Sequence, residues 1–360
     1  MKTDCALMTL TFVGSIEWRV TTQKLDFRNE SASFSGHTSG HTSGHTMTDY
    51  LSHIKPLLMS AHCVPLPFLQ GFPVDVGGID VLRLDDIHPL LSGNKLFKLS
   101  GYLQQLETGS DGGLITPGGV HSNHLHAVAA VGAWLSIPTV GLVRGYASQP
   151  LTETLKDCQR WGMTLQFLDR KQYARRYEAE WQRNQAEQHQ ALWVGEGGAG
   201  DSASLAGHYL APYCDGYDEV WLAVGSGTTA RSLLPRLADD TRLVGVNVVA
   251  DQGERRRDWQ ASLPSGRWTL LETDHWGRFA HLDEAGRQLI DRFDQRSLPL
   301  DPVYGVRLMR AFLDHGPITP GSRCLLIHGG GLQGRRGFGL SWPVIRHDEP
   351  ALDFPPAPGA

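Results

Sequence analysis

The chain has 360 residues, of which 41% are hydrophobic and 20% are charged, and its formal net charge is −5. This composition is typical of a globular protein, and the length leaves room for two domains with cores of ordinary size. Basic residues do not gather in runs, and no apolar run approaches the roughly 18 residues that cross a membrane, so we expect neither nucleic acid nor a membrane as a partner.

The five cysteines lie far apart, and no pair has the spacing of a metal site or of a redox motif. An odd number of scattered cysteines is typical of reduced thiols in a reducing compartment. We therefore predict a cytoplasmic protein without a metal centre.

The first 48 residues differ in character from the rest. A mildly apolar stretch at 6–16 has an aspartate at its charged end and no cleavage pattern of small residues, which disfavours a secretory signal. Residues 35–46 repeat Ser-Gly-His-Thr three times. The three histidines could bind a metal, but such a repeat is more typical of a flexible linker. Because Met47 follows directly, we expect 1–48 to be a disordered or non-native extension.

From residue 60 onward, short apolar runs alternate with amphipathic stretches. Regular alternation of this kind is typical of parallel sheets whose strands are joined by helical crossovers. Strands are predicted at 79–84, 113–116, 139–143, 164–168, 220–224, 243–249 and 324–327. Helices are predicted at 96–106, 122–135, 151–161, 172–190, 230–237 and 306–313. The proline-rich segment 348–360 is predicted to be an irregular tail.

Two short glycine-containing segments, 92–99 and 116–124, stand out. The first presents Lys95 in a Gly-Asn-Lys turn, and the second places Ser122 and Asn123 in a turn after an apolar run. A lysine amine forms Schiff bases with carbonyl compounds once burial or a neighbouring cation lowers its pKa. Each segment alone is also what an ordinary glycine turn or helix cap looks like. Together they suggest a lysine presented to a carbonyl cofactor, with a hydroxyl and an amide nearby.

A third segment, 220–229, has the pattern of a strand, a glycine-rich turn and the start of a helix. Successive backbone N–H groups and hydroxyls at such a turn suit a phosphate. The turn consists of Gly225, Ser226, Gly227, Thr228 and Thr229. Its pattern is neither GxGxxG nor a P-loop, which disfavours dinucleotides and triphosphates. A crossover without any ligand would have the same sequence.

Three features remain in the C-terminal half. Glycine clusters at 195–202 and 328–331 follow apolar runs, where α/β enzymes place ligand loops, although the first would also suit an interdomain connection. Between them, the proline at 302 fixes a turn just before Tyr304, which precedes an amphipathic stretch. Such a tyrosine suits a general acid or a hydrogen-bond donor, and equally a core tyrosine whose hydroxyl is bonded.

The motifs at 93–95, 118–124, 225–229 and 301–304 resemble, in order and spacing, those of the 1-aminocyclopropane-1-carboxylate deaminase / D-cysteine desulfhydrase family. The resemblance extends from about residue 65 to 340. Members of that family are pyridoxal-phosphate enzymes. The resemblance therefore implies pyridoxal 5'-phosphate as cofactor and an α/β fold of type II, with two open, twisted, mainly parallel sheets flanked by helices.

The same resemblance implies a division into domains. A large cofactor-binding domain would comprise residues 49–97 and 197–347, and a small α/β domain would comprise 98–196. The cofactor would lie in the cleft between them.

The resemblance also assigns roles. Lys95 matches the lysine that binds the cofactor's aldehyde, whereas Lys98 is given no role. Ser122 matches a serine implicated in proton transfer, and Asn123 matches the residue that hydrogen-bonds the cofactor's phenolic oxygen. Tyr304 matches the active-site tyrosine, and the glycine-rich turn matches the phosphate-binding loop.

Several substrate-side positions depart from the family pattern. Gly305 stands where the deaminases carry a glutamate at the pyridine nitrogen, His121 stands where glutamine is usual, and a second tyrosine expected after 278–280 is missing. Without a carboxylate partner, the pyridine nitrogen stays less protonated and withdraws electrons less strongly. This favours an elimination over the opening of a cyclopropane ring.

We therefore predict a pyridoxal-phosphate-dependent lyase, hydrolase or deaminase that acts on a small amino acid. The predicted reaction is of the D-cysteine desulfhydrase type, a β-elimination that gives a keto acid and ammonia. One alternative is a 1-aminocyclopropane-1-carboxylate deaminase or an amino-acid racemase, and another is a catalytically degenerate pyridoxal-phosphate-binding protein. By analogy with the family, we expect a homodimer.

Overall fold

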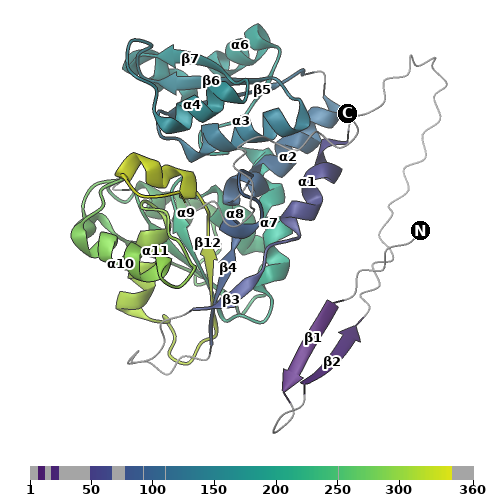
Figure 1. The fold of residues 1–360 in the computed structure, drawn as a ribbon, viewed down its shortest axis with the longest axis vertical. Coiled ribbons are helices and arrows are strands. Elements are labelled where there is room, and N and C mark those ends of the chain that lie inside the picture. Colours follow the sequence, from purple (N-terminus) through teal and green to yellow (C-terminus); the bar gives the residue numbers. More distant parts are fainter. Residues whose placement is uncertain are drawn as a thin grey trace, which may run out of the picture. The chain divides into compact units, whose positions relative to one another are not determined.

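The computed structural model describes residues 7–12, 18–23, 49–66, 78–91, 93–109, 111–249 and 251–342 (Figure 1). The chain divides into two compact units, Met1–Thr46 and Met47–Ala360. No helix in the described residues has the length and apolar character needed to cross a membrane.

In the first unit, β1 (Leu7–Phe12) pairs with β2 (Trp18–Gln23) in an antiparallel ladder. Threonine, which favours strands, occurs twice in each segment, and the expectation that 1–48 is a disordered or non-native extension stays a prediction. The repeat at 35–46 and the tail predicted at 348–360 lie outside the described residues.

The larger sheet of the second unit has six strands in the order β11-β10-β9-β12-β4-β3, all parallel except β3, which pairs antiparallel with β4. The strands are β3 (Cys63–Pro65), β4 (Ile79–Arg83), β9 (Glu219–Val224), β10 (Arg242–Asn247), β11 (Trp268–Glu272) and β12 (Cys324–His328). The four predicted strands of this sheet are confirmed within two residues. The two edge strands escaped prediction because they are only partly buried and carry no continuous apolar run.

The smaller sheet has four parallel strands in the order β7-β6-β5-β8. They are β5 (Leu114–Gly119), β6 (Thr139–Arg144), β7 (Thr164–Leu168) and β8 (Leu192–Trp193). The strand predicted at 113–116 continues through its Pro-Gly-Gly segment, which was expected to form a turn. Gly118 and Gly119 still pair with Val143 and Arg144, so the turn begins three residues later than predicted.

Helices cover the faces of both sheets (Figure 1). They are α1 (Tyr50–Leu58), α2 (Asn94–Thr108), α3 (Asn123–Leu135), α4 (Glu153–Arg160), α5 (Arg170–Ala174), α6 (Ala179–His189), α7 (Leu205–Leu210), α8 (Thr228–Leu233), α9 (Glu254–Ser262), α10 (Glu284–Asp294) and α11 (Gly305–His315). Two short 3-10 segments also matter for the site, namely η3 (Asp201–Ser204) and η7 (Leu332–Phe338).

Two predicted helices are wrong in extent. The stretch 172–190 is broken into α5, a 3-10 turn and α6, because Glu178 adopts an extended conformation between them. The helix predicted at 230–237 starts earlier, at Thr228, and ends at Leu233, since Pro235 leads the chain into a 3-10 turn.

Helix α2 is the element that brings the two sheets together. Nine of its residues are buried, and it packs against α1, α3 and α7 and against η3. The packing is so close that a Cβ atom at Gly101 would lie 1.7 Å from the Ser202 carbonyl oxygen. The site residues at the start of α2 are therefore fixed on a buried, rigid helix.

The observed architecture confirms the predicted α/β fold with two mainly parallel sheets flanked by helices. All four strands of the smaller sheet fall within 98–196, the range predicted for the small domain. Helix α2 crosses the predicted boundary at 98, and it packs more on α1, α7 and η3 than on α3. The domain limits therefore stay a prediction.

Candidate active site

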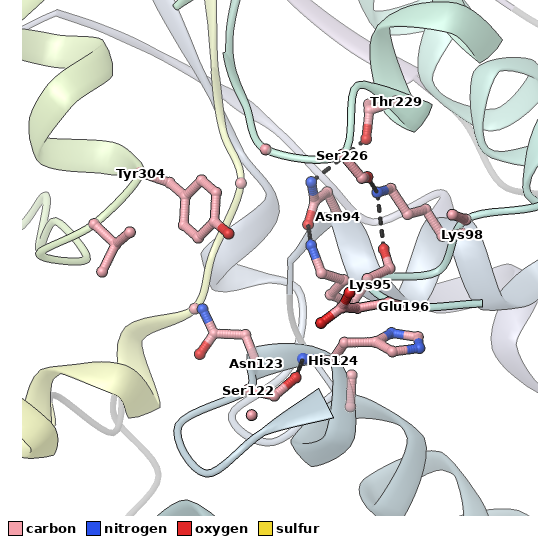
Figure 2. Close-up of a pocket in the computed structure, with 18 of the residues that line it drawn as sticks. Asn94, Lys95, Lys98, Ser122, Asn123, His124, Glu196, Ser226, Thr229 and Tyr304 are labelled. Carbon is pink, nitrogen blue, oxygen red and sulfur yellow. Dashed lines mark hydrogen bonds between the residues drawn. The ribbon is translucent and has the colours of Figure 1, made fainter. Parts of the chain in front are cut away.

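A single large cavity of about 1660 Å³ gathers the predicted site residues. Its wall includes all of them except Thr228, and they follow the carboxyl ends of β5 and β9, one strand from each sheet, or stand at the starts of α2 and α11 (Figure 2). Parallel α/β sheets place ligands at this edge. The predicted residues that line the cavity are Lys95, Ser122, Asn123, Gly225, Ser226, Gly227, Thr229 and Tyr304.

Lys95 is held by a close approach between two glycine segments. Gly93, at φ +84°, precedes α2, and a Cβ atom there would lie 2.5 Å from the Gly329 carbonyl oxygen. The Asn94 backbone donates to that same oxygen at 3.0 Å. The Lys95 ammonium donates to Asn94 Oδ1 at 3.1 Å and lies 5.9 Å from the centre of the Tyr304 ring. The amine is therefore directed into the cavity by backbone contacts.

Burial lowers the pKa of Lys95 to about 8, against the opposing effect of Asp301. Removal from water disfavours the charged ammonium, so the neutral amine becomes accessible near physiological pH. A neutral lysine amine is the nucleophilic form.

Lys95 should react with amine-specific reagents at lower pH than a lysine in water, whose pKa is about 10.4. We expect half-maximal labelling of Lys95 near pH 8, measured by mass spectrometry with fragmentation to separate it from Lys98. The Lys95→Arg protein serves as the control and should lack this labelling. Labelling that starts only above about pH 10 would contradict the buried, neutral amine.

Lys98 lines the same cavity, one helical turn after Lys95, and was not predicted as a site residue. Its ammonium donates to the Gly197 carbonyl at 3.0 Å and to Ser226 Oγ at 3.2 Å. Burial lowers its pKa well below the usual value, and the positive charges of Lys95, Arg231 and Arg255 lower it further. The i, i+3 spacing of the two lysines was the signal that could have revealed it, because such residues share one face of a helix.

The turn after β9 is a cluster of hydrogen-bond donors. Gly227 adopts φ +77°, and the hydroxyls of Ser226 and Thr228 lie 3.0 Å apart. Arg255 at the start of α9 donates to the Ser226 carbonyl at 2.8 Å, and its Nε has no partner among the described residues. With Lys98, this turn forms a positively charged wall of the cavity.

The start of α3 forms the opposite wall (Figure 2). Ser122 caps the helix, and its Oγ accepts the backbone N–H groups of His124 and Leu125, both at 3.2 Å. These bonds leave the Ser122 hydroxyl hydrogen free to be donated. Asn123 Oδ1 accepts a hydrogen bond from Gln333 at 2.9 Å.

His124 is buried, and its Nε2 lies 2.9 Å from Thr116 Oγ1. Burial lowers its pKa well below the usual value, and the charges of Lys95 and Lys98 act in the same direction. The ring is therefore neutral and adds no positive charge next to the two lysines.

Asp301 positions Tyr304. Its buried carboxylate accepts the N–H groups of Val303, Tyr304 and Gly305 at 3.0, 2.7 and 2.5 Å. Burial raises the pKa of Tyr304, and the charges of Asp301 and Glu196 raise it further, so the hydroxyl stays protonated. A Cβ atom at Gly225 would lie 3.1 Å from the tyrosine ring, which explains why a glycine stands there.

Glu196 is a cavity residue that sequence reasoning passed over within the glycine cluster at 195–202. Its carboxylate accepts hydrogen bonds from Tyr173, Arg176 and Tyr177 at 2.6, 2.7 and 3.0 Å. The glycine cluster thus connects to α5 and the turn after it, on the side of the smaller sheet. This supports the reading of the cluster as a loop that faces the cavity.

At Gly305, the position of the glutamate in the family pattern, a Cβ atom would lie 2.8 Å from Asp301 Oδ2. The loop that lacks the second tyrosine contributes Phe279 and Ala280 to the cavity wall. Buried Arg307 holds this loop by donating to the carbonyl oxygens of residues 277 and 278 at 2.9 and 2.8 Å. Among the described residues, no group of three or more His, Cys, Asp or Glu side chains is placed to hold a metal.

No protein-family model matches the chain. Among solved structures, an ACC deaminase homologue matches with a TM-score of 0.65 and 22% identity, over 82% of this chain and 98% of that one. O-acetyl serine sulfhydrylase isoform 3 from Entamoeba histolytica matches with a TM-score of 0.58 and 12% identity, over 87% of this chain and 96% of that one. A pyridoxal 5'-phosphate-dependent aspartate racemase matches with a TM-score of 0.55 and 11% identity, over 78% and 93%.

The chain has the type II fold of pyridoxal-phosphate enzymes. This confirms the fold that the sequence motifs implied. At these identities the likeness establishes the fold alone. The reaction that this protein catalyses has to be inferred from the residues that line its cavity.

Proposed function

We propose that this protein is a pyridoxal-phosphate-dependent enzyme that removes the β-substituent of a small amino acid and releases a keto acid and ammonia, as a D-cysteine desulfhydrase does. The observation that carries the proposal is the pair of buried lysines on α2. Lys95 offers a neutral amine to the cavity, and Lys98 is a buried amine with no carboxylate partner among the described residues, whose charged form a bound anion would favour. One cofactor, an aldehyde that carries a phosphate, would give Lys95 a carbonyl group to react with and Lys98 an anion to pair with.

The remaining donors fit the same group. The turn at 225–229, with Lys98 and Arg255, suits the phosphate, because its backbone N–H groups, its hydroxyls and these two side chains can donate hydrogen bonds to an anion. Asn123 suits the phenolic oxygen as a hydrogen-bond donor. Gly305 leaves the pyridine nitrogen without a carboxylate from that position, which favours elimination over ring opening.

The proposed proton transfers of this reaction are assigned to residues of the chain. Pyridoxal phosphate, when bound, supplies an electron-withdrawing ring that stabilises negative charge on the carbon bearing the amino group. Lys95 or Ser122 accepts the proton from that carbon. Protonated Tyr304 donates its hydroxyl proton to the group that leaves the neighbouring carbon with the bonding electron pair. The enamine that remains takes up a proton from water at that neighbouring carbon, and a second water replaces the amino group, which departs as ammonia.

The test begins with cofactor binding. Adding pyridoxal phosphate to the purified protein should produce a visible absorbance band. The loaded protein is then given D- and L-cysteine, D- and L-serine, β-chloroalanine and 1-aminocyclopropane-1-carboxylate, and keto acid, ammonia and the chirality of the remaining substrate are measured.

Keto acid and ammonia from a β-substituted amino acid would support the proposal. Inversion of chirality without keto acid would instead indicate a racemase, and turnover of the cyclopropane substrate would indicate a 1-aminocyclopropane-1-carboxylate deaminase. A visible band without turnover would indicate a protein that binds pyridoxal phosphate without catalysing a reaction. No band would refute the cofactor itself. A homodimer and a cytoplasmic location stay predictions.

A further inference from the structure

Gln333 is a buried polar residue of the cavity wall that the proposed chemistry does not use. It belongs to η7, which follows the glycine segment after β12, whereas Asn123 begins α3 beside the smaller sheet. Its Nε2 donates to Asn123 Oδ1 at 2.9 Å. The two amides thus link segments that lie far apart in the sequence.

This bond decides which end of the Asn123 amide is available. An asparagine side chain has one acceptor oxygen and two N–H donors on nitrogen. Because Gln333 occupies the oxygen, the nitrogen is the end left to interact with a ligand. Figure 2 shows the Asn123 side chain among the labelled cavity residues, with its nitrogen on the side of Tyr304. Without Gln333, rotation of the amide by half a turn would present the oxygen instead.

The backbone that carries Gln333 is fixed from both sides of the cavity. Arg335 is buried and donates to Asp294 and to the Leu300 carbonyl at 2.8 Å. Arg336 donates to Asp157 of α4 at 2.5 Å and, through Nε, to the Gln333 carbonyl at 3.2 Å. Because this backbone is already fixed, the Gln333 side chain loses little further conformational entropy when it holds Asn123.

We propose that Gln333 is a positioning residue that orients the Asn123 amide so that its N–H group is donated to the phenolic oxygen of pyridoxal phosphate. The proposal rests on the proposed function and adds a residue to it. Asn123 alone would offer a donor or an acceptor, and an acceptor facing an anionic oxygen is repulsive. Gln333 removes that second orientation.

The consequence is measurable on the cofactor without turnover. A hydrogen bond donated to a phenolate stabilises the form with fewer protons and lowers the pKa of the lysine-bound cofactor. A hydrogen bond to a charged group is worth about one pKa unit or more. Loss of an oriented Asn123 should therefore raise the pH midpoint of the visible band by roughly one unit.

The experiment compares wild type with Gln333→Met, which keeps the side-chain volume without an amide, and Gln333→Glu, which can only accept. Each protein is loaded with pyridoxal phosphate, and its spectrum is recorded against pH. Equilibrium dialysis gives the affinity for the cofactor, which should fall about tenfold with the loss of one such bond. Gln182→Leu is the matched control, because Gln182 also lines the cavity but donates to the Arg176 carbonyl.

We expect an upward shift of about one pH unit in Gln333→Met, a shift at least as large in Gln333→Glu, and none in Gln182→Leu. In an Asn123→Ala background, Gln333→Met should add no further shift, since its effect acts through Asn123. A purely structural role would lower the unfolding temperature in both backgrounds alike. The other charged or titratable groups of the cavity wall are the same in every variant, among them Lys95, Lys98, His121, His124, Glu196, Arg255, Asp301 and Tyr304.

The inference fails if Asn123→Ala changes the midpoint or the cofactor affinity while both Gln333 variants behave like wild type. It also fails if Gln333→Met shifts the midpoint equally with and without Asn123. The absence of any visible band in wild type would instead refute the proposed function, so the two failures are distinguishable.

Discussion

The Lys95→Ala protein is expected to lose the visible absorbance band with pyridoxal phosphate and to lose activity by roughly 10³-fold or more. The change removes the amine whose burial lowers its pKa to about 8, and with it one of the two groups proposed to accept the substrate proton. Alanine is a good helix former, so α2 should remain intact. Absorbance spectra and keto-acid release measure the two effects.

Lys98→Met is the matched comparison on the same helix face. It removes a cation that bonds to Ser226 and Gly197, but leaves the amine of Lys95 in place. We expect this protein to keep the visible band and to need about tenfold or more cofactor to develop it, because one charge-assisted bond to the phosphate is lost. An unchanged band in Lys95→Ala, or a band lost only in Lys98→Met, would reverse the assignment of the two lysines.

Asp301→Ala is expected to cause the largest loss of stability of any single change at the site, about 3–5 kcal/mol in the free energy of unfolding. The substitution leaves three backbone N–H groups without an acceptor, at residues 303, 304 and 305, the last of which is buried. Because those residues carry Tyr304 into the cavity, activity should fall with stability. Urea unfolding followed by circular dichroism measures the first effect.

Asp301→Asn tests the interpretation, since it keeps one oxygen acceptor and should recover part of the stability. Asp239→Ala is the control for loss of a carboxylate, because Asp239 is fully exposed and bonds only Arg267 among the described residues. Its unfolding midpoint should match that of wild type. An Asp301→Ala protein as stable as wild type would mean that the three N–H groups find other partners.

The buried strands could be predicted from sequence because most of them contain a short apolar run, as in 220–224. The break between α5 and α6 could not, because it depends on the extended backbone of Glu178, which the helical pattern of the sequence does not mark. The edge strand β11 is defined by its pairing with β10 rather than by its own burial. Boundaries set by tertiary contacts are the usual limit of such predictions.

The same limit applies to the site. Lys95, Ser122 and Asn123 carry their signal in adjacent residues, so a single chain was enough to select them. Lys98 and Gln333 gain their roles only when distant segments meet, at the turn after β9 and at the start of α3. For Lys98, the i, i+3 spacing from Lys95 indicates a shared helix face, but no neighbouring residue predicts its partner in the turn after β9.

The position of β12 in the larger sheet also sets an order of assembly. This strand, near the end of the described chain, lies between β4 and β9 and pairs with both. The smaller sheet, by contrast, is complete once residue 193 has been made. During synthesis the smaller sheet can therefore form early, whereas β4 lacks its neighbour β12 until residue 328 has been made. Until then its apolar edge is open, and chain truncations before β12 are expected to yield aggregating protein.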